Sequence, residues 1–153
     1  MKRYRNILVL ILVLLAIPSF TVAAFCKTSQ ISETIRSNDR SITLKTAVID
    51  DERIEINFLI QNTGTSDIKV SSFLSFRSEN AAGQNLTNDS FSCSGTTIDG
   101  TILPLSELTG LVCFKIQEPG PYKVFYQPGW GPSADDMVWQ IDSTVSGANL
   151  ETA

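Results

Sequence analysis

Two stretches in the first half of the chain alternate between apolar and polar side chains, the two-residue period of a strand with one buried face. They are residues 42–48 and residues 54–60. The acidic residues 50–52 between them are typical of a polar turn, and Asn-Thr-Gly at 62–64 tolerates left-handed backbone. The pattern therefore predicts an antiparallel hairpin.

The rest of the chain repeats this strand pattern and shows almost no helical period of 3.6 residues. We expect further strands at residues 68–70, 73–77, 111–116, 122–126 and 137–141. Many short strands joined by turns predict two packed antiparallel sheets, an all-β sandwich. A closed barrel would show the same alternation, so the period leaves both architectures open, and we favour the sandwich.

The succession of several segments is similar to that of a known domain family. It comprises Asn-Thr-Gly at 62–64, Ile-Lys-Val at 68–70, a Leu103-Pro104 step feeding 110–116, then 122–126 and 139–141. It resembles the telokin-like immunoglobulin-like domain of bacterial secreted and surface proteins and lipoproteins, which is similar to a secreted mycobacterial antigen. Over residues 40–142 the resemblance implies an immunoglobulin-like β-sandwich without an established enzymatic role. The family usually has Gly after the proline of this step, where this chain has Leu105.

The N-terminal segment has the composition of an export signal. Three basic residues precede an unbroken apolar stretch at 7–17, and small residues close the segment at 22–24. We therefore expect a signal peptide or hydrophobic helix over residues 1–24. A linker at 25–39, the sandwich at 40–142 and a flexible tail at 143–153 would follow.

Three outcomes of export remain open. Cleavage after Ala24 would release a mature chain that begins at Phe25. Acylation of Cys26 would give a lipoprotein, although Phe25 is larger than the residue such processing prefers. An uncleaved segment over 7–25 is about long enough to anchor the protein in a bilayer. In each case the body faces outward, so we expect a secreted or cell-envelope protein that contacts the membrane only through its N-terminal segment.

The negative net charge of the chain excludes some classes of partner. Without residues 1–24 it keeps nine basic and sixteen acidic residues, a net charge of −7. Nucleic acid and anionic lipid repel such a surface, so we expect no nucleic-acid binding.

Export would place the three cysteines in an oxidising environment, where disulfide bonds form. Cys93 and Cys113 both fall within the expected sandwich, and we expect them to form a disulfide; two buried free thiols are the alternative. Cys26 is then left over as a lipid site, an intermolecular partner or an unpaired thiol.

The aromatic residues near the C-terminus divide into two groups. Val124, Tyr126 or Phe125, and Trp139 follow the strand alternation and are expected in the core. Trp130 stands between two glycines in a Pro-rich loop, which makes it a candidate for recognition of a partner.

The sequence offers little for catalysis or metal binding. It has no His and no paired cysteine spacing for zinc, and the acidic runs at 50–52 and 135–136 supply only part of a calcium shell. Neither a nucleophile elbow nor a Ser-x-x-Lys set is present. We expect a non-enzymatic protein without metal, cofactor or catalytic residues.

Two classes of function remain. The first is an extracellular interaction module that binds an envelope protein, a host surface or a small ligand, and we favour it. The second is a structural or accessory domain of the cell envelope without a binding specificity of its own.

Overall fold

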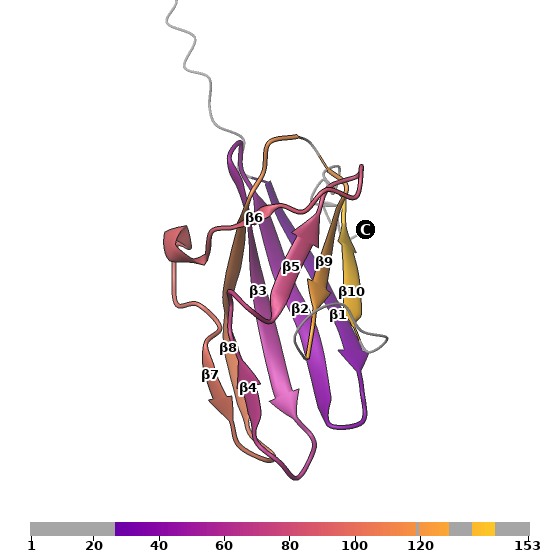
Figure 1. The fold of residues 1–153 in the computed structure, drawn as a ribbon, viewed down its shortest axis with the longest axis vertical. Coiled ribbons are helices and arrows are strands. Elements are labelled where there is room, and N and C mark those ends of the chain that lie inside the picture. The colour runs from indigo at the N-terminus through magenta and orange to yellow at the C-terminus, as the bar shows by residue number, and fades with distance from the viewer. Residues whose placement is uncertain (1–26, 119, 129–135, 143–153) are drawn as a thin grey trace, which may run out of the picture.

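The computed structural model describes residues 27–118, 120–128 and 136–142, and they form the predicted antiparallel β-sandwich (Figure 1). The expected signal segment at 1–24 and tail at 143–153 lie outside the described residues. Within the described part, no helix combines the length and the apolar composition that crossing a bilayer requires. The elements are β1 (Lys27–Arg36), β2 (Arg40–Ile49), β3 (Arg53–Asn62), β4 (Ile68–Val70), β5 (Phe76–Glu79), β6 (Thr87–Asn88), the 3₁₀ turn η1 (Ser90–Ser92), β7 (Gly100–Ile102), β8 (Glu107–Lys115), β9 (Tyr122–Tyr126) and β10 (Met137–Ile141).

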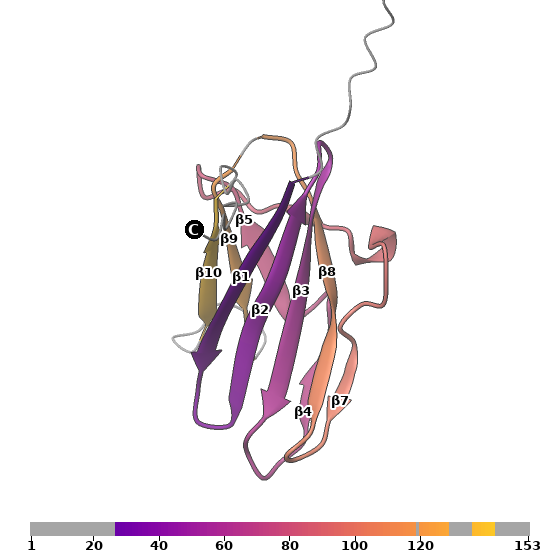
Figure 2. The same ribbon diagram turned by 180° about the vertical axis from the view of Figure 1, so that it is seen from behind.

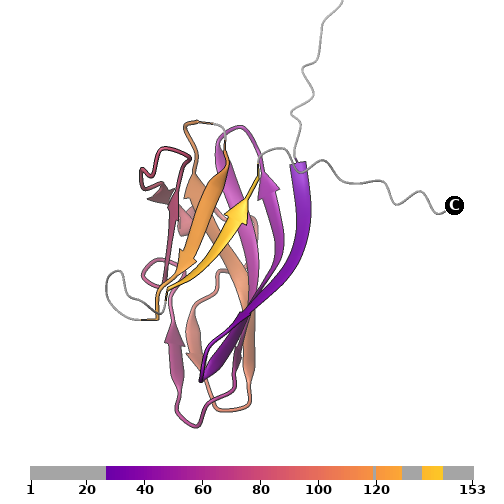
Figure 3. The ribbon, with the colours of Figure 1, turned by 90° about the vertical axis from the view of Figure 1, so that its right-hand side faces the viewer.

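The sandwich has two layers. One is a five-stranded sheet in the order β1-β2-β3-β8-β6, whose long strands are seen from behind in Figure 2. The facing layer holds the sheet β10-β9-β5 and the pair β4-β7. Figure 3 shows the layers edge on, with the start of β1 and the end of β10 at the same end of the sandwich.

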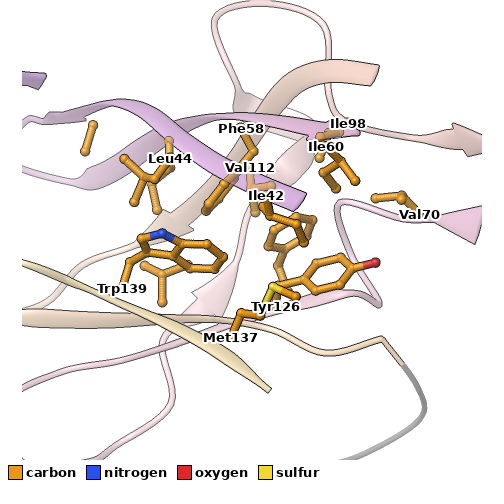
Figure 4. Close-up of a cluster of buried hydrophobic side chains, with 14 of the residues drawn as sticks. Ile42, Leu44, Phe58, Ile60, Val70, Ile98, Val112, Tyr126, Met137 and Trp139 are labelled. Atoms are coloured by element: carbon orange, nitrogen blue, oxygen red, sulfur yellow. The ribbon is translucent and has the colours of Figure 1, made fainter. Parts of the chain in front are cut away.

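The core lies between the two layers. Trp139, Tyr126 and Met137 point from the smaller sheet toward side chains of the larger sheet, including Phe58 (Figure 4). The Phe58 ring centroid lies 5.3 Å from that of Trp139 in an edge-to-face arrangement. Val124, Tyr126 and Trp139 are fully buried, so their predicted core role is confirmed, and Tyr122 is buried with them at 1% exposed.

Phe125 takes the other face of β9, because successive side chains of a strand point to opposite sides. The guanidinium carbon of Arg77 lies 3.5 Å from the centroid of the Phe125 ring. Of the two alternatives left open by the sequence, Tyr126 and not Phe125 is therefore the core residue.

The predicted hairpin of residues 42–48 and 54–60 is confirmed, but its burial pattern contains a break. A register shift between Leu44 and Thr46 inserts an extra residue into β2. A bulge of this kind reverses the faces of the residues that follow it. Consequently Ala47 is fully buried while Val48 is only half-buried, the reverse of strict alternation.

The structure differs from the expected linker at 25–39, because residues 27–36 form β1. This strand pairs with β2 along its length, with a register shift between Gln30 and Glu33. Ser32 within the shift has φ 44°, so the strand has no continuous two-residue period. The strand is therefore held by its backbone pairing with β2. Such pairing leaves no pattern of apolar residues in the sequence by which the strand could be predicted.

The expected strand at 73–77 is largely replaced by a turn. Only Phe76 and Arg77 belong to β5, whereas residues 71–75 fold back so that the Ser75 amide donates to the Ser71 carbonyl at 2.8 Å. This turn exposes Phe73 and Leu74, two apolar side chains that the sequence pattern placed in a strand.

Candidate interaction site

Ser72 is a buried serine where three chain segments meet, and its amide, hydroxyl and carbonyl groups all form hydrogen bonds. Its amide and hydroxyl donate to the two carboxylate oxygens of Asp99, at 2.9 and 2.8 Å. Its carbonyl accepts hydrogen bonds from the Asn88 side-chain amide at 2.8 Å and from the Ser90 hydroxyl at 3.4 Å. The network therefore joins the turn after β4, the segment around η1 and the segment before β7.

The turn after β4 presents Phe73 and Leu74 to solvent, 55% and 54% exposed. The Ser71 hydroxyl oxygen accepts hydrogen bonds from the amides of Phe73 and Leu74, at 3.3 and 3.4 Å. The Ser71 amide donates to the Ser75 hydroxyl oxygen at 3.0 Å. Local hydrogen bonds of this kind fix the turn with both apolar side chains outward.

The η1 turn presents Phe91, which is 97% exposed, while its two neighbours are held by the protein. The buried Ser90 hydroxyl also bonds to the Asn88 side-chain oxygen at 2.8 Å. On the other side, an Arg53 guanidinium nitrogen donates to the Ser92 carbonyl. The backbone that carries Phe91 is thus held in place, while the Phe91 ring itself lies almost fully in solvent.

The predicted disulfide between Cys93 and Cys113 is confirmed, and it fastens the segment directly after η1 to β8. The two Cα atoms lie 5.7 Å apart. Glu55 accepts hydrogen bonds from the amide and hydroxyl of Ser94, at 2.7 and 2.6 Å, which fastens the same segment to β3.

Phe73, Leu74 and Phe91 surround a hollow of about 420 Å³, which we call the Ser72 slot. Large exposed apolar side chains that gather around a hollow are a common mark of an interaction site. The slot is lined by Ser71, Ser72, Phe73, Leu74, Ser90, Phe91, Thr97 and Asp99.

Asp99 is the one charged residue of the slot lining. Burial by itself would raise its pKa, but hydrogen bonds from Thr97, Ser72 and Ser71 outweigh that effect, so the pKa of Asp99 lies below its usual value. The slot therefore contains a carboxylate at neutral pH, beneath apolar edges.

Gly110 on β8 allows the segment that carries Thr97 and Asp99 to lie where it does. The Ile98 amide donates to the Leu111 carbonyl at 3.1 Å, so the segment crosses directly over Gly110. A Cβ atom on Gly110 would lie 2.7 Å from the Ile98 nitrogen, closer than real contacts allow. Only glycine fits this crossing without displacement of the backbone.

None of the other residues that the sequence suggests as sites is among the described residues that line the Ser72 slot. Trp130 and Cys26 lie outside the described residues, so the predictions made for them stay predictions. Within the described ranges, Glu55, Cys93 and Cys113 form a group with ligand atoms close enough to share a metal ion. However, the two sulfur atoms are joined in the disulfide, and Glu55 is bonded to Ser94.

Two exposed leucines lie on the turn between β7 and β8. Leu103 and Leu105 are 58% and 90% exposed, and Leu105 has φ 62°. The Ser106 amide donates to the Leu103 carbonyl at 3.1 Å, which closes a four-residue turn. Leu105 thus has the backbone conformation that favours Gly. The hollow of about 250 Å³ beside it is otherwise lined by polar residues, which are Gln61, Asn62, Thr63, Ser106 and Glu107.

The sequence did not identify Phe73, Leu74 and Phe91 as site residues. The strand pattern places Phe73 and Leu74 in a strand, and no pattern in the sequence singles out Phe91. The available signal was the serines that flank all three, because Ser side chains favour turns.

The chain matches no protein-family model and no curated protein sequence. Among solved structures it is similar to ycdA, a predicted lipoprotein of Bacillus subtilis, with a TM-score of 0.62 and 18% identity. That similarity covers 74% of this chain but 39% of ycdA. The yjhA protein of Bacillus subtilis gives a TM-score of 0.60 at 19% identity, covering 73% of this chain and 98% of yjhA.

An uncharacterized β-sandwich protein of Clostridium difficile is also similar, with a TM-score of 0.50 and 16% identity. It covers 73% of this chain and 91% of its own length. The finer resemblance to telokin-like domains stays a prediction. At these identities the comparisons establish one thing about this chain: it has the β-sandwich fold of these bacterial proteins.

Proposed function

We propose that this chain is a non-enzymatic recognition module outside the cytoplasm, and that the Ser72 slot binds a partner protein. One observation carries the proposal: a buried polar network holds three exposed apolar side chains around a common hollow. Aromatic side chains carried by a backbone that is already ordered need less ordering on binding, and such side chains are typical interface anchors. The export signal, the disulfide and the similarity to a predicted lipoprotein support the location.

The test measures binding of the exported protein, purified from its host, to an envelope fraction of the same cells. We expect saturable binding that is lost when Phe73→Ser and Phe91→Ser are combined. Leu105→Asn is the control, because it removes an apolar side chain that is 90% exposed and lies outside the slot. Thermal unfolding of each variant shows whether the fold is kept.

Two results would count against the proposal. Equal binding by the double variant and the wild type would show that the slot is not used. Association that rises without saturation would favour the second class, an accessory envelope domain with no binding specificity.

A further inference from the structure

The η1 turn separates two hollows of different character. The Ser72 slot lies on the side of Ser90 and Phe91, whereas Asp89 and Ser92 of the same segment line a second hollow of about 480 Å³. This second hollow, which we call the acidic hollow, carries four carboxylates and two basic groups. They belong to Asp50, Asp51, Glu52, Asp89, Arg53 and Lys115.

Part of this charge is already neutralised within the protein. The Arg53 guanidinium forms an ion pair with Asp50 at 3.1 Å and donates to the Ser92 carbonyl. Asp50 also accepts hydrogen bonds from the backbone amides of Glu52 and Arg53, at 2.9 and 2.8 Å. These two residues therefore serve the turn between β2 and β3 and the position of η1.

The remaining groups of the acidic hollow are three carboxylates and one ammonium. Among the described residues, the side chains of Asp51, Glu52, Asp89 and Lys115 form no ion pair. The acidic hollow thus has a negative excess beside the apolar edge formed by Phe91. Asp99 places a further carboxylate in the slot itself.

From this juxtaposition we propose that the partner is a polypeptide segment with a Lys or Arg close to an apolar side chain. The apolar side chain enters the Ser72 slot, and the cationic group crosses η1 to lie among Asp51, Glu52 and Asp89. This inference rests on the proposed function. Opposite charge across an interface mainly adds specificity and speed of association, and the net charge of −7 on residues 25–153 extends the attraction beyond the site.

A random twelve-residue peptide library displayed on phage provides the probe, with the exported protein as bait. Three variants are compared with the wild type. The slot variant combines Phe73→Ser with Phe91→Ser, and the charge variant combines Asp51→Asn, Glu52→Gln and Asp89→Asn. The matched control, Asp67→Asn with Glu107→Gln and Asp142→Asn, removes the same number of exposed carboxylates elsewhere.

We expect peptides that need the slot and that contain Lys or Arg more often than the unselected library. As synthetic peptides they should bind the charge variant about tenfold more weakly than the wild type or the control, and the gap should narrow between about 50 mM and about 300 mM salt. Slot-dependent peptides without basic residues, or equal binding to the charge variant, would overturn this inference and leave the proposed function standing.

Two other results would also be decisive. If no peptide needs the slot, the proposed function fails together with the inference. If the wild type sediments as a dimer and the slot variant as a monomer, the slot takes a second copy of the chain, and the basic partner is ruled out.

Discussion

Asp99 binds Ser72 through both carboxylate oxygens, one on the backbone amide at 2.9 Å and one on the hydroxyl at 2.8 Å. The two residues lie on different segments, so this pair fixes the turn that carries Phe73 against the segment that leads into β7. The shape of the slot therefore depends on Asp99.

Asp99→Ala should lower the free energy of unfolding by roughly 1–3 kcal/mol, because the buried Ser72 amide loses its acceptor. Asp99→Asn keeps one acceptor oxygen and should cost less. Urea unfolding followed by circular dichroism measures both changes. An Asp99→Ala protein as stable as the wild type would show that water replaces the carboxylate without loss.

The same carboxylate predicts a dependence of stability on pH. Because the folded pKa of Asp99 lies below the ordinary value of 3.8, the unfolded chain takes up this proton more readily. The stabilisation is therefore complete above that ordinary value and is lost as the pH falls through the lower folded pKa.

Urea unfolding of the wild type and of Asp99→Asn between about pH 6 and about pH 2 tests this dependence. The wild type should lose more stability than the variant over this range. Asp39 and Asp50, whose pKa values are also lowered, are present in both proteins, so the difference isolates Asp99. Parallel curves for the two proteins would contradict the prediction.

Gly110→Ala should destabilise the protein by roughly 1–3 kcal/mol, because the new Cβ would push the backbone at Ile98 away from β8. Gly95→Ala is the matched control, since its Cβ would meet only the end of the Leu111 side chain, at 3.2 Å. Denaturant unfolding of both variants gives the comparison. A Gly110→Ala protein no less stable than Gly95→Ala would show that the crossing segment adapts.

Leu105→Asn should raise the free energy of unfolding by roughly 0.5–1 kcal/mol, because Asn adopts positive φ more easily than Leu. The substitution loses almost no buried surface, since Leu105 is 90% exposed. Leu105→Val, with a β-branched side chain, should have the opposite effect. Thermal unfolding ranks the three proteins, and a less stable Leu105→Asn would contradict the assignment of strain to this residue.

Replacement of both Cys93 and Cys113 by Ala should cost roughly 3 kcal/mol of stability in the chain-entropy account of a loop of about 20 residues. The wild type treated with a reducing dithiol should lose a similar amount. If the double variant instead unfolds at the same denaturant concentration as the oxidised wild type, the disulfide contributes little to stability.

The strands with a regular apolar period could be predicted from the sequence. Residues 122–126 and 137–141 match β9 and β10 in both bounds, because each alternates between the core and solvent without a bulge. β1 could not be found in this way, since its bulge and its polar residues leave no period to detect. The two-residue β6 is held by pairing with β8, which only the tertiary structure supplies.

Less of the candidate site than of the fold could be predicted from the sequence. The disulfide followed from the number of cysteines and from the expected compartment. The slot depends on Ser72 meeting Asp99, Asn88 and Ser90 across distant segments, and common polar residues give no signal of such a meeting in one sequence. Apolar residues were assigned to strands, and this assumption concealed Phe73 and Leu74.

The start of β1 and the end of β10 share one end of the sandwich (Figure 3), and the turn between β7 and β8, which contains Leu105, lies at the opposite end (Figure 1). The domain is therefore suited to use as a display scaffold. A carrier protein fused before β1 or after β10 would leave the opposite end of the sandwich accessible. A foreign peptide inserted beside Leu105 would then project away from that carrier protein. Because Leu105 is not among the residues that line the Ser72 slot, such a graft would leave the slot intact. One molecule would then carry both the foreign peptide and its own binding slot.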